Sequence, residues 1–179
     1  MPTVDVDGRP ALRLERAIAL PAERVWPALT EPARLGRWYP FPVAELQPRV
    51  GGRLAFDYQG KAIEATITDF EAPRVFAFDE HDLAGHEREF DDHVVMELGP
   101  GDAAGSCVLV FTHIPSDPSG TEGVLAGWEK CLDRLVAEVG GGGAAGKTAG
   151  AAAAGAPPAK PAPKPTPKPA PKPGPKPGP

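Results

Sequence analysis

The fold is decided by a stretch near residue 140 that reads GTEGVLAGWEKCLDRLVAEV, residues 120–139. Its apolar side chains recur at helical spacing and share one face: Val124, Trp128, Leu132, Leu135 and Val139. Gly140 and the glycines after it end the pattern. The stretch therefore predicts a long amphipathic helix, which needs an apolar surface to cover.

That surface is predicted to be a sheet, because strand-like segments precede the helix. Apolar residues alternate with polar ones in a series of short ranges: 11–20, 53–58, 62–71, 74–80, 90–98 and 106–113. Turn sequences such as Gln59-Gly60 separate successive segments, and short turns join antiparallel strands. We expect an α+β fold in which a curved antiparallel sheet of six strands wraps around the C-terminal helix.

Two short helices are predicted between the first and second strands. Pro21 suits the first turn of a helix. Pro27 limits the length of this helix because a proline inside a helix lacks the amide hydrogen that the preceding turn needs. Pro32 then opens a second helix that is predicted to end near Trp38.

Composition divides the chain into a folded domain and a tail. We expect an N-terminal extension at residues 1–9, one domain at residues 10–139 and a disordered tail at residues 140–179, in which every residue is Gly, Ala, Pro, Lys or Thr. All 24 acids precede residue 140, together with 13 of the 19 bases, so residues 1–139 carry a net charge of −11 and the tail +6. Such an acidic domain repels phosphate, and we expect no direct nucleic-acid binding by it.

The tail ends in the repeat KPAPKPTPKPAPKPGPKPGP, residues 160–179. Proline at alternate positions excludes helix and ladder pairing and favours polyproline II. One interpretation is a solubilising spacer that also touches the acidic domain. The other interpretation is that the repeat docks to a polyanion or to an aromatic groove that binds proline-rich segments.

The cysteines and the N-terminus indicate the cellular compartment in which the protein is expected. Cys107 and Cys131 both fall on apolar faces, but a disulfide needs Cα atoms within about 7 Å, and reduced thiols are the default expectation. Residues 1–10 lack the basic and apolar regions of a signal peptide, and no apolar run reaches the ~18 residues of a membrane span. We expect a soluble cytoplasmic protein without a cofactor.

The strand alternation also defines a candidate ligand site on the predicted inner face. Its members, in chain order, are Trp38, Phe56, Tyr58, Phe76, Phe78, Glu80, Met96, Phe111, His113, Val124 and Trp128. They either form core alone or include a subset that lines an apolar pocket. Trp38, Tyr58, His113 and Trp128 are preferred as lining residues because each combines apolar area with a polar group.

His113 is the one catalytic candidate. An imidazole titrates near neutral pH and suits proton transfer. No nucleophile elbow, phosphate loop or paired-carboxylate motif accompanies it in the sequence. The alternative is a structural histidine that is satisfied by hydrogen bonds.

The segment DEHDLAGHEREFDDH, residues 79–93, raises the question of a metal site. It holds seven acids and the histidines His81, His86 and His93. These histidines are five and seven residues apart, without the short fixed spacing that metal sites use. A solvated acidic loop is the preferred interpretation, and the segment can equally form a pocket rim with Glu80 as a polar anchor.

Several collinear blocks carry a resemblance to a known family: VWPALTEPARLGRWYP (25–40), VGGRLAFDY (50–58), ITDFEAPRVFAF (67–78), SCVLVFTH (106–113) and GWEKCLDRL (127–135). The chain resembles the START-like (SRPBCC, helix-grip) superfamily and, within it, proteins similar to the activator of the heat-shock-protein-90 ATPase. The resemblance implies a helix-grip fold with a hydrophobic pocket. Pro27 and Glu80 depart from the usual pattern, which often has a Trp at the second position.

Three functions remain open at this point. The first is non-enzymatic binding of a small hydrophobic molecule in an internal cavity, with a regulatory or stress-related role. The second is a polyketide-cyclase-like enzyme that uses His113, and the third is a co-chaperone-like interaction module. The absence of a second acid-base residue on the predicted inner face favours the first over the second.

Overall fold

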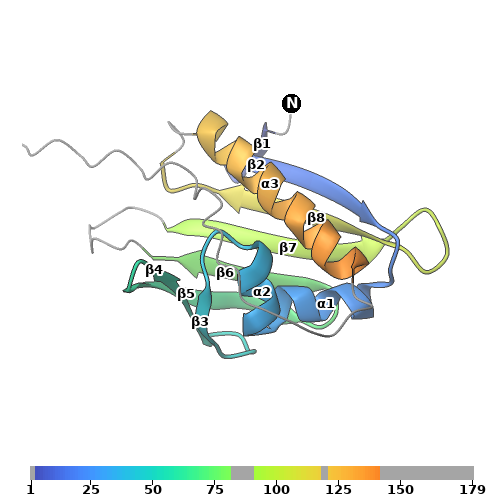
Figure 1. The fold of residues 1–179 in the computed structure, drawn as a ribbon. Helices are drawn as coiled ribbons and strands as arrows, with labels where there is room; N and C mark the ends of the chain where they lie inside the picture. Colours follow the sequence, from blue (N-terminus) through green and yellow to red (C-terminus); the bar gives the residue numbers. More distant parts are fainter. Residues whose placement is uncertain (1–2, 82–90, 118–120, 142–179) are drawn as a thin grey trace, which may run out of the picture.

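The computed structural model describes residues 3–81, 91–117 and 121–141. Its elements, in chain order, are β1 (Thr3–Val6), β2 (Arg9–Ile18), α1 (Ala22–Thr30), α2 (Pro32–Trp38), β3 (Val43–Leu46), β4 (Arg53–Tyr58), β5 (Lys61–Glu71), β6 (Val75–Glu80), β7 (Asp92–Pro100), β8 (Cys107–Ile114) and α3 (Thr121–Gly140). The strands form one antiparallel sheet in the order β1-β2-β8-β7-β6-β5-β4-β3 (Figure 1). The predicted α+β helix-grip architecture is confirmed.

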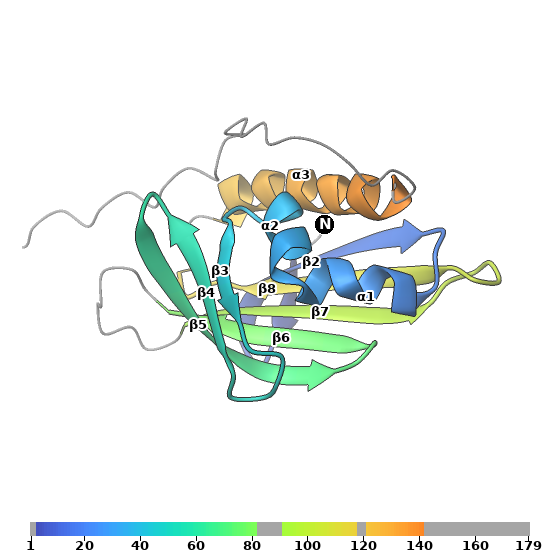
Figure 2. The same ribbon diagram turned by 60° about the horizontal axis from the view of Figure 1, so that its bottom comes forward.

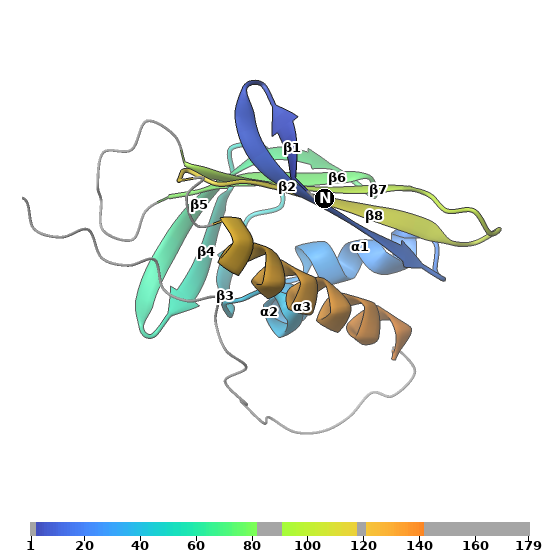
Figure 3. The ribbon, with the colours of Figure 1, turned by 90° about the horizontal axis from the view of Figure 1, so that it is seen from above.

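All three helices lie on the same face of the sheet. Figure 2 shows β3, β4 and β5 rising beside α2, so that the sheet curves around the helices. Figure 3 shows the β1–β2 hairpin on the side of the sheet away from α3. We call the face that α3 covers the inner face and the opposite one the outer face.

The sheet has eight strands, so the expectation of six was wrong. The two additional strands are β1 and β3, each four residues long, which is too short for a distinct alternation in the sequence. Asp7 and Gly8 join β1 to β2 with φ values of 52° and 79°. Asp-Gly with both residues at positive φ is a favoured hairpin turn, and β1 lies inside the segment predicted to be an N-terminal extension.

The two short helices follow from the prolines that surround them. Pro27 lies inside α1, which ends three residues later at Thr30, and Pro32 is the first residue of α2. Glu31 ends one helix and precedes the other. Its amide donates to the carbonyl of Pro27. Trp38 then donates its indole N–H to the carbonyl of Ala28 over 2.8 Å, which fixes the angle between the two helices.

The core lies between the inner face and the helices. The apolar stripe predicted for the last helix is confirmed, because Trp128, Leu132, Leu135 and Val139 are buried. Arg134 anchors α3 to α2 by donating to the carbonyl of Trp38 over 3.1 Å. Among residues 3–81, 91–117 and 121–141, none of the helices has the length and hydropathy of a membrane-spanning segment.

The turn between β3 and β4 is tied to β5 where β5 bulges. The register of β5 against β6 shifts between Ile67 and Asp69. The amide of Gly51 donates to the carbonyl of Ile67, and the amide of Ile67 donates to the carbonyl of Gly52, at 2.8 and 2.9 Å. Gly52 has no room for a side chain, because a Cβ there would overlap the carbonyl of Gln47 and lie 2.7 Å from that of Arg49. This junction holds the curved end of the sheet.

Candidate functional site

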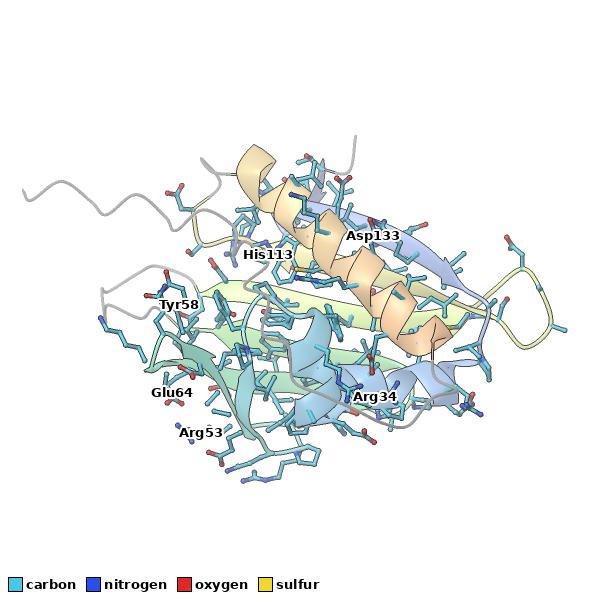
Figure 4. All side chains as sticks on the ribbon, viewed as in Figure 1. Arg34, Arg53, Tyr58, Glu64, His113 and Asp133 are labelled. Atoms are coloured by element: carbon cyan, nitrogen blue, oxygen red, sulfur yellow. The ribbon has the colours of Figure 1, made fainter. Side chains whose placement is uncertain are left out.

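The candidate residues lie in or against one contiguous apolar cluster on the inner face. Most of them are fully buried: Trp38, Phe56, Phe76, Phe78, Met96 and Phe111. His113 and Trp128 retain 5% and 7% exposure, whereas Tyr58, Glu80 and Val124 are half-buried. Figure 4 shows His113 beneath α3 and Tyr58 at the end of β4.

Tyr39 lies at the centre of this cluster, although it is absent from the predicted set. Its ring stacks on Phe56 with centroids 4.5 Å apart and meets the rings of Trp128 at 5.3 Å and Phe78 at 6.1 Å. Tyr39 follows α2 in a Trp-Tyr-Pro-Phe-Pro segment that has neither helical nor strand periodicity. No periodic signal was therefore available to place it on the inner face.

Tyr39 forms a polar pair with Glu80 at the end of β6. The hydroxyl of Tyr39 donates to Oε2 of Glu80 over 3.1 Å. Burial, and then the neighbouring Glu80 carboxylate, raise the pKa of Tyr39 well above its usual value near 10. The phenol is therefore a neutral donor at physiological pH. One interpretation of the acidic segment predicts Glu80 as the polar anchor of a pocket rim. The structure brings its carboxylate to the phenol of Tyr39, and the anchoring role stays a prediction.

A second polar group links β8, α3 and β7. Trp128 donates its indole N–H to Nδ1 of His113 over 3.2 Å. Since Nδ1 accepts, the neutral imidazole carries its proton on Nε2, which lies 3.9 Å from Oδ2 of Asp92. The other oxygen of Asp92 accepts the amide of Ser116 at 2.5 Å. The ring of His113 is thus held between a donor on α3 and a carboxylate on β7.

The two carboxylates belong to adjacent strands. Glu80 and Asp92 are cross-strand partners, and the Asp92 side chain is 16% exposed. Each also takes part in a further interaction. Asp92 is absent from the predicted set, but it is in phase with Val94 and Met96 on β7, so the strand alternation was sufficient to find it.

This polar end of the cluster is also where it meets solvent. The half-buried rings of Phe41 and Tyr58 lie there, with centroids 5.5 Å apart. Val124 and Leu125 of α3 are half-buried and pack against the cluster. The inner face therefore has a closed apolar interior and a polar, partly accessible end.

The cysteines are both free and buried. Burial raises the pKa of both thiols, and the neighbouring Arg134 partly offsets this for Cys131. The guanidinium of Arg134 donates to Sγ of Cys131 over 3.1 Å. These thiols are protonated and poorly reactive at neutral pH.

The histidines of the acidic segment lie apart from the inner cluster. On the outer face, Nδ1 of His93 lies 2.6 Å from Oδ1 of Asp79. Nδ1 of His81 is 2.7 Å from Oδ2 of Asp91, and its Nε2 is 2.9 Å from the hydroxyl of Thr66. His86 lies outside the described residues. Within the described ranges, no three His, Cys, Asp or Glu side chains are arranged to hold a metal ion.

Comparison with solved structures identifies the fold. Protein MLL2253 of Mesorhizobium loti is 21% identical, with a TM-score of 0.62 over 74% of this chain and 98% of its own. CalU16 of Micromonospora echinospora is 23% identical, with a TM-score of 0.59 over 76% of this chain and 82% of its own. The Aha1 dimer of Colwellia psychrerythraea is 16% identical, with a TM-score of 0.61 over 72% of this chain and 95% of its own. At these identities the likeness establishes the fold alone.

The family model of activator of Hsp90 ATPase homolog 1-like proteins matches residues 19–140. A search of the curated proteins found no match. The match starts directly after β2 and runs through α3, so it covers the strands β3 to β8, all three helices and the whole aromatic cluster. It also confirms the resemblance to the START-like superfamily. Because this match extends over more than half of the sequence, the chain belongs to the family of activator of Hsp90 ATPase homolog 1-like proteins.

Proposed function

We propose that the chain binds a small, largely apolar molecule between the inner face of the sheet and α3. The observation that carries this proposal is the polar pair of Tyr39 and Glu80 inside a cluster of aromatic rings. Small-molecule sites are mostly apolar and contain a few fixed polar groups that orient the ligand.

The ligand enters at the end where the cluster is half-buried. Phe41, Tyr58 and Val124 border that end. The rings of Tyr39 and Phe56 are in stacking contact, so binding requires the ring of Tyr39 or of Phe41 to turn aside. Side-chain rotations of this kind are common on binding.

The polar end favours a neutral ligand that carries a hydrogen-bond donor. Glu80 and Asp92 place two carboxylates on adjacent strands, and an anionic ligand would be repelled by both. A hydroxyl group, by contrast, would donate to Glu80 in the place of the Tyr39 phenol. An alcohol or a phenol on an apolar skeleton therefore fits this end better than a carboxylic acid.

Binding without turnover is the preferred form of this function. The lone pair of His113 that a general base would use is occupied by the indole N–H of Trp128. This contact argues against a cyclase that relies on His113 and favours a carrier or a ligand-responsive regulator, including a stress-related one. The co-chaperone-like module remains a prediction that rests on the family model. A cytoplasmic location is likewise a prediction, and it agrees with the free thiols of Cys107 and Cys131.

The experiment is calorimetric titration of the full chain with two matched probes, 2-naphthol and 2-naphthoate. We expect 2-naphthol to bind with higher affinity than 2-naphthoate. In the Glu80→Gln variant, the two affinities should become more similar. The control variant is Glu129→Gln, which changes an exposed carboxylate of α3 and should leave both affinities unchanged. Failure of both probes to bind, together with no small molecule retained in native mass spectrometry of the protein from its own cells, would contradict the proposal.

A further inference from the structure

The outer face of the sheet carries a groove of about 670 Å³. It is lined by Val6, Asp7, Arg9, Arg13, Asp79, Asp91, His93, Val95, Glu97, Thr112 and Ile114. The β1–β2 hairpin supplies one side, and β6, β7 and β8 supply the floor and the other side. Figure 3 shows this hairpin on the side of the sheet away from α3, so the groove is separate from the site between the sheet and α3.

Part of the floor of the groove is apolar. Thr112 of β8 and Val95 of β7 are cross-strand partners, and Ile114 lies next to them on the same face of β8. Val6 extends this surface from the hairpin. A volume of this size is within the range of pockets that hold drug-sized ligands.

The sides of the groove are acidic. Four carboxylates line it against two guanidinium groups, which gives the lining a net charge of −2 with His93 neutral. Both arginines already have partners. Arg9 donates to the carbonyls of Asp91 and Pro115, and Nε of Arg13 lies 3.6 Å from Oε1 of Glu15. The hairpin contributes Asp7, whereas Asp79 lies on β6, Glu97 lies on β7 and Asp91 directly precedes β7. The groove therefore suits an occupant that is cationic on more than one side.

We propose that this groove binds the chain's own Lys-Pro repeat, residues 160–179. The repeat places a lysine at every fourth residue, with proline at alternate positions. Polyproline II has three residues per turn, so successive lysines point about 120° apart around the axis. Lysines of neighbouring repeats thus reach carboxylates on both sides of the groove, while the proline rings between them pack on Val95, Thr112 and Ile114.

The chain is long enough for this contact. The 19 residues at 141–159 separate α3 from the repeat, and they span up to ~65 Å when extended. A folded domain of about 130 residues has a radius of gyration of roughly 14 Å. The repeat therefore reaches around the edge of the sheet from the end of α3 to the outer face.

The overall charges support the same pairing. Residues 1–139 carry −11 and the tail carries +6. Each exposed ion pair contributes little to binding on its own, but the covalent linker holds the repeat at an effective concentration of about millimolar. Docking is consequently intramolecular, reversible and sensitive to salt.

The test places a nitroxide spin label in the repeat of the full chain by the substitution Thr166→Cys. Cys107 and Cys131 are buried with raised pKa values, so the new thiol is labelled selectively. We expect paramagnetic broadening to be strongest at the amides of Val6, Val95 and Thr112. The broadening should fall about threefold or more between ~0.1 M and ~1 M NaCl, which shortens the Debye length from ~10 Å to ~3 Å.

A pair of variants tests the groove. Asp7→Asn with Glu97→Gln removes one carboxylate from the hairpin and one from β7, and asparagine tolerates the positive φ of residue 7. We expect the paramagnetic broadening of the amide signals at the groove to fall about threefold or more in this variant. The matched control, Glu31→Gln with Glu129→Gln, removes two exposed carboxylates outside the groove and should keep the broadening of the parent chain.

A second variant, changed only in the tail, tests the proposal without altering the groove, in case the groove variant misfolds. Replacing the five lysines of the repeat with glutamine leaves residues 1–141 untouched and should abolish the salt-sensitive broadening. Broadening spread evenly over the domain, or centred on α3, would overturn the proposal. So would broadening at the groove that survives the lysine replacement.

Discussion

Trp128 of α3 donates its indole N–H to Nδ1 of His113 on β8 over 3.2 Å. The contact joins the C-terminal helix to the inner face at a point where both side chains are nearly buried. It fixes the tautomer of the imidazole and directs Nε2 toward Asp92. A histidine that the sequence offered as a catalytic candidate is therefore held in a structural hydrogen bond.

Trp128→Phe should destabilise the fold by about 1–3 kcal/mol, because it removes the indole hydrogen bond to the buried Nδ1 of His113. The measurement is the free energy of unfolding in urea. Trp26→Phe is the matched control, since the half-buried Trp26 packs edge-on against Phe70 and the smaller ring keeps much of that contact. Equal losses in the two variants would show that the indole N–H of Trp128 has no special role.

Tyr39→Phe should change how stability depends on pH. The pKa of Tyr39 is raised in the folded state, so its contribution to stability is complete below pH ~10, where the unfolded phenol is neutral, and is lost as the pH rises through the folded pKa. Urea unfolding between pH 8 and 11 should show a steeper alkaline loss for the parent chain than for Tyr39→Phe. At neutral pH the variant should lower the free energy of unfolding by about 1–3 kcal/mol, because the hydrogen bond from the Tyr39 phenol to Glu80 is lost.

If the parent chain and Tyr39→Phe lost stability in parallel above pH 10, the phenol would titrate as it does in the unfolded chain. That result would contradict the burial of Tyr39 beside Glu80. The two cysteines, whose pKa values are also raised, are present in both chains and cancel in the comparison.

Gly52→Ala should destabilise the fold by more than 1 kcal/mol, because a Cβ at residue 52 would overlap the carbonyl of Gln47 and crowd that of Arg49. Gly99→Ala is the control: no heavy atom lies within 4 Å of a Cβ placed there. Thermal unfolding of both variants gives the comparison. A Gly52→Ala chain as stable as Gly99→Ala would contradict the geometry of the β3–β4 turn.

Phe78→Ala should cost about 3–5 kcal/mol, since a fully buried ring is replaced by a cavity. The ring lies 5.9 Å from that of Phe56 and 6.1 Å from that of Tyr39, so the loss falls on the centre of the cluster. Val50→Ala at a 60% exposed position should change stability by less than ~0.5 kcal/mol. Urea unfolding measures both, and a loss below ~1 kcal/mol for Phe78→Ala would contradict close packing at this site.

The long elements of the fold could be predicted from the sequence because their periodicity reports burial directly. Alternation placed β4 at its observed bounds, Arg53–Tyr58, and the helical stripe placed α3 against the sheet. The strands β1 and β3 could not be predicted this way, since four residues carry too little periodicity. Both are stabilised by pairing with a longer neighbour.

The apolar part of the candidate site was predictable for the same reason, and so were the strand residues Glu80 and His113 of its polar part, whereas Tyr39 was not. Tyr39 reaches the inner face from the segment that follows α2, and its contact with Glu80 joins residues 41 positions apart. Such a contact depends on how the whole sheet curves, which no local pattern records. The outer groove was also invisible in the sequence, because it depends on where the β1–β2 hairpin lies.

The most direct test of ligand binding between the sheet and α3 is an isotope-filtered NOE experiment on the full, labelled chain with unlabelled 2-naphthol. Binding between the sheet and α3 should give intermolecular NOEs from the naphthyl protons to the rings of Tyr39, Phe56 and Trp128. NOEs confined to outer-face residues such as Val95 and Thr112, or none at the solubility limit of the probe, would contradict it.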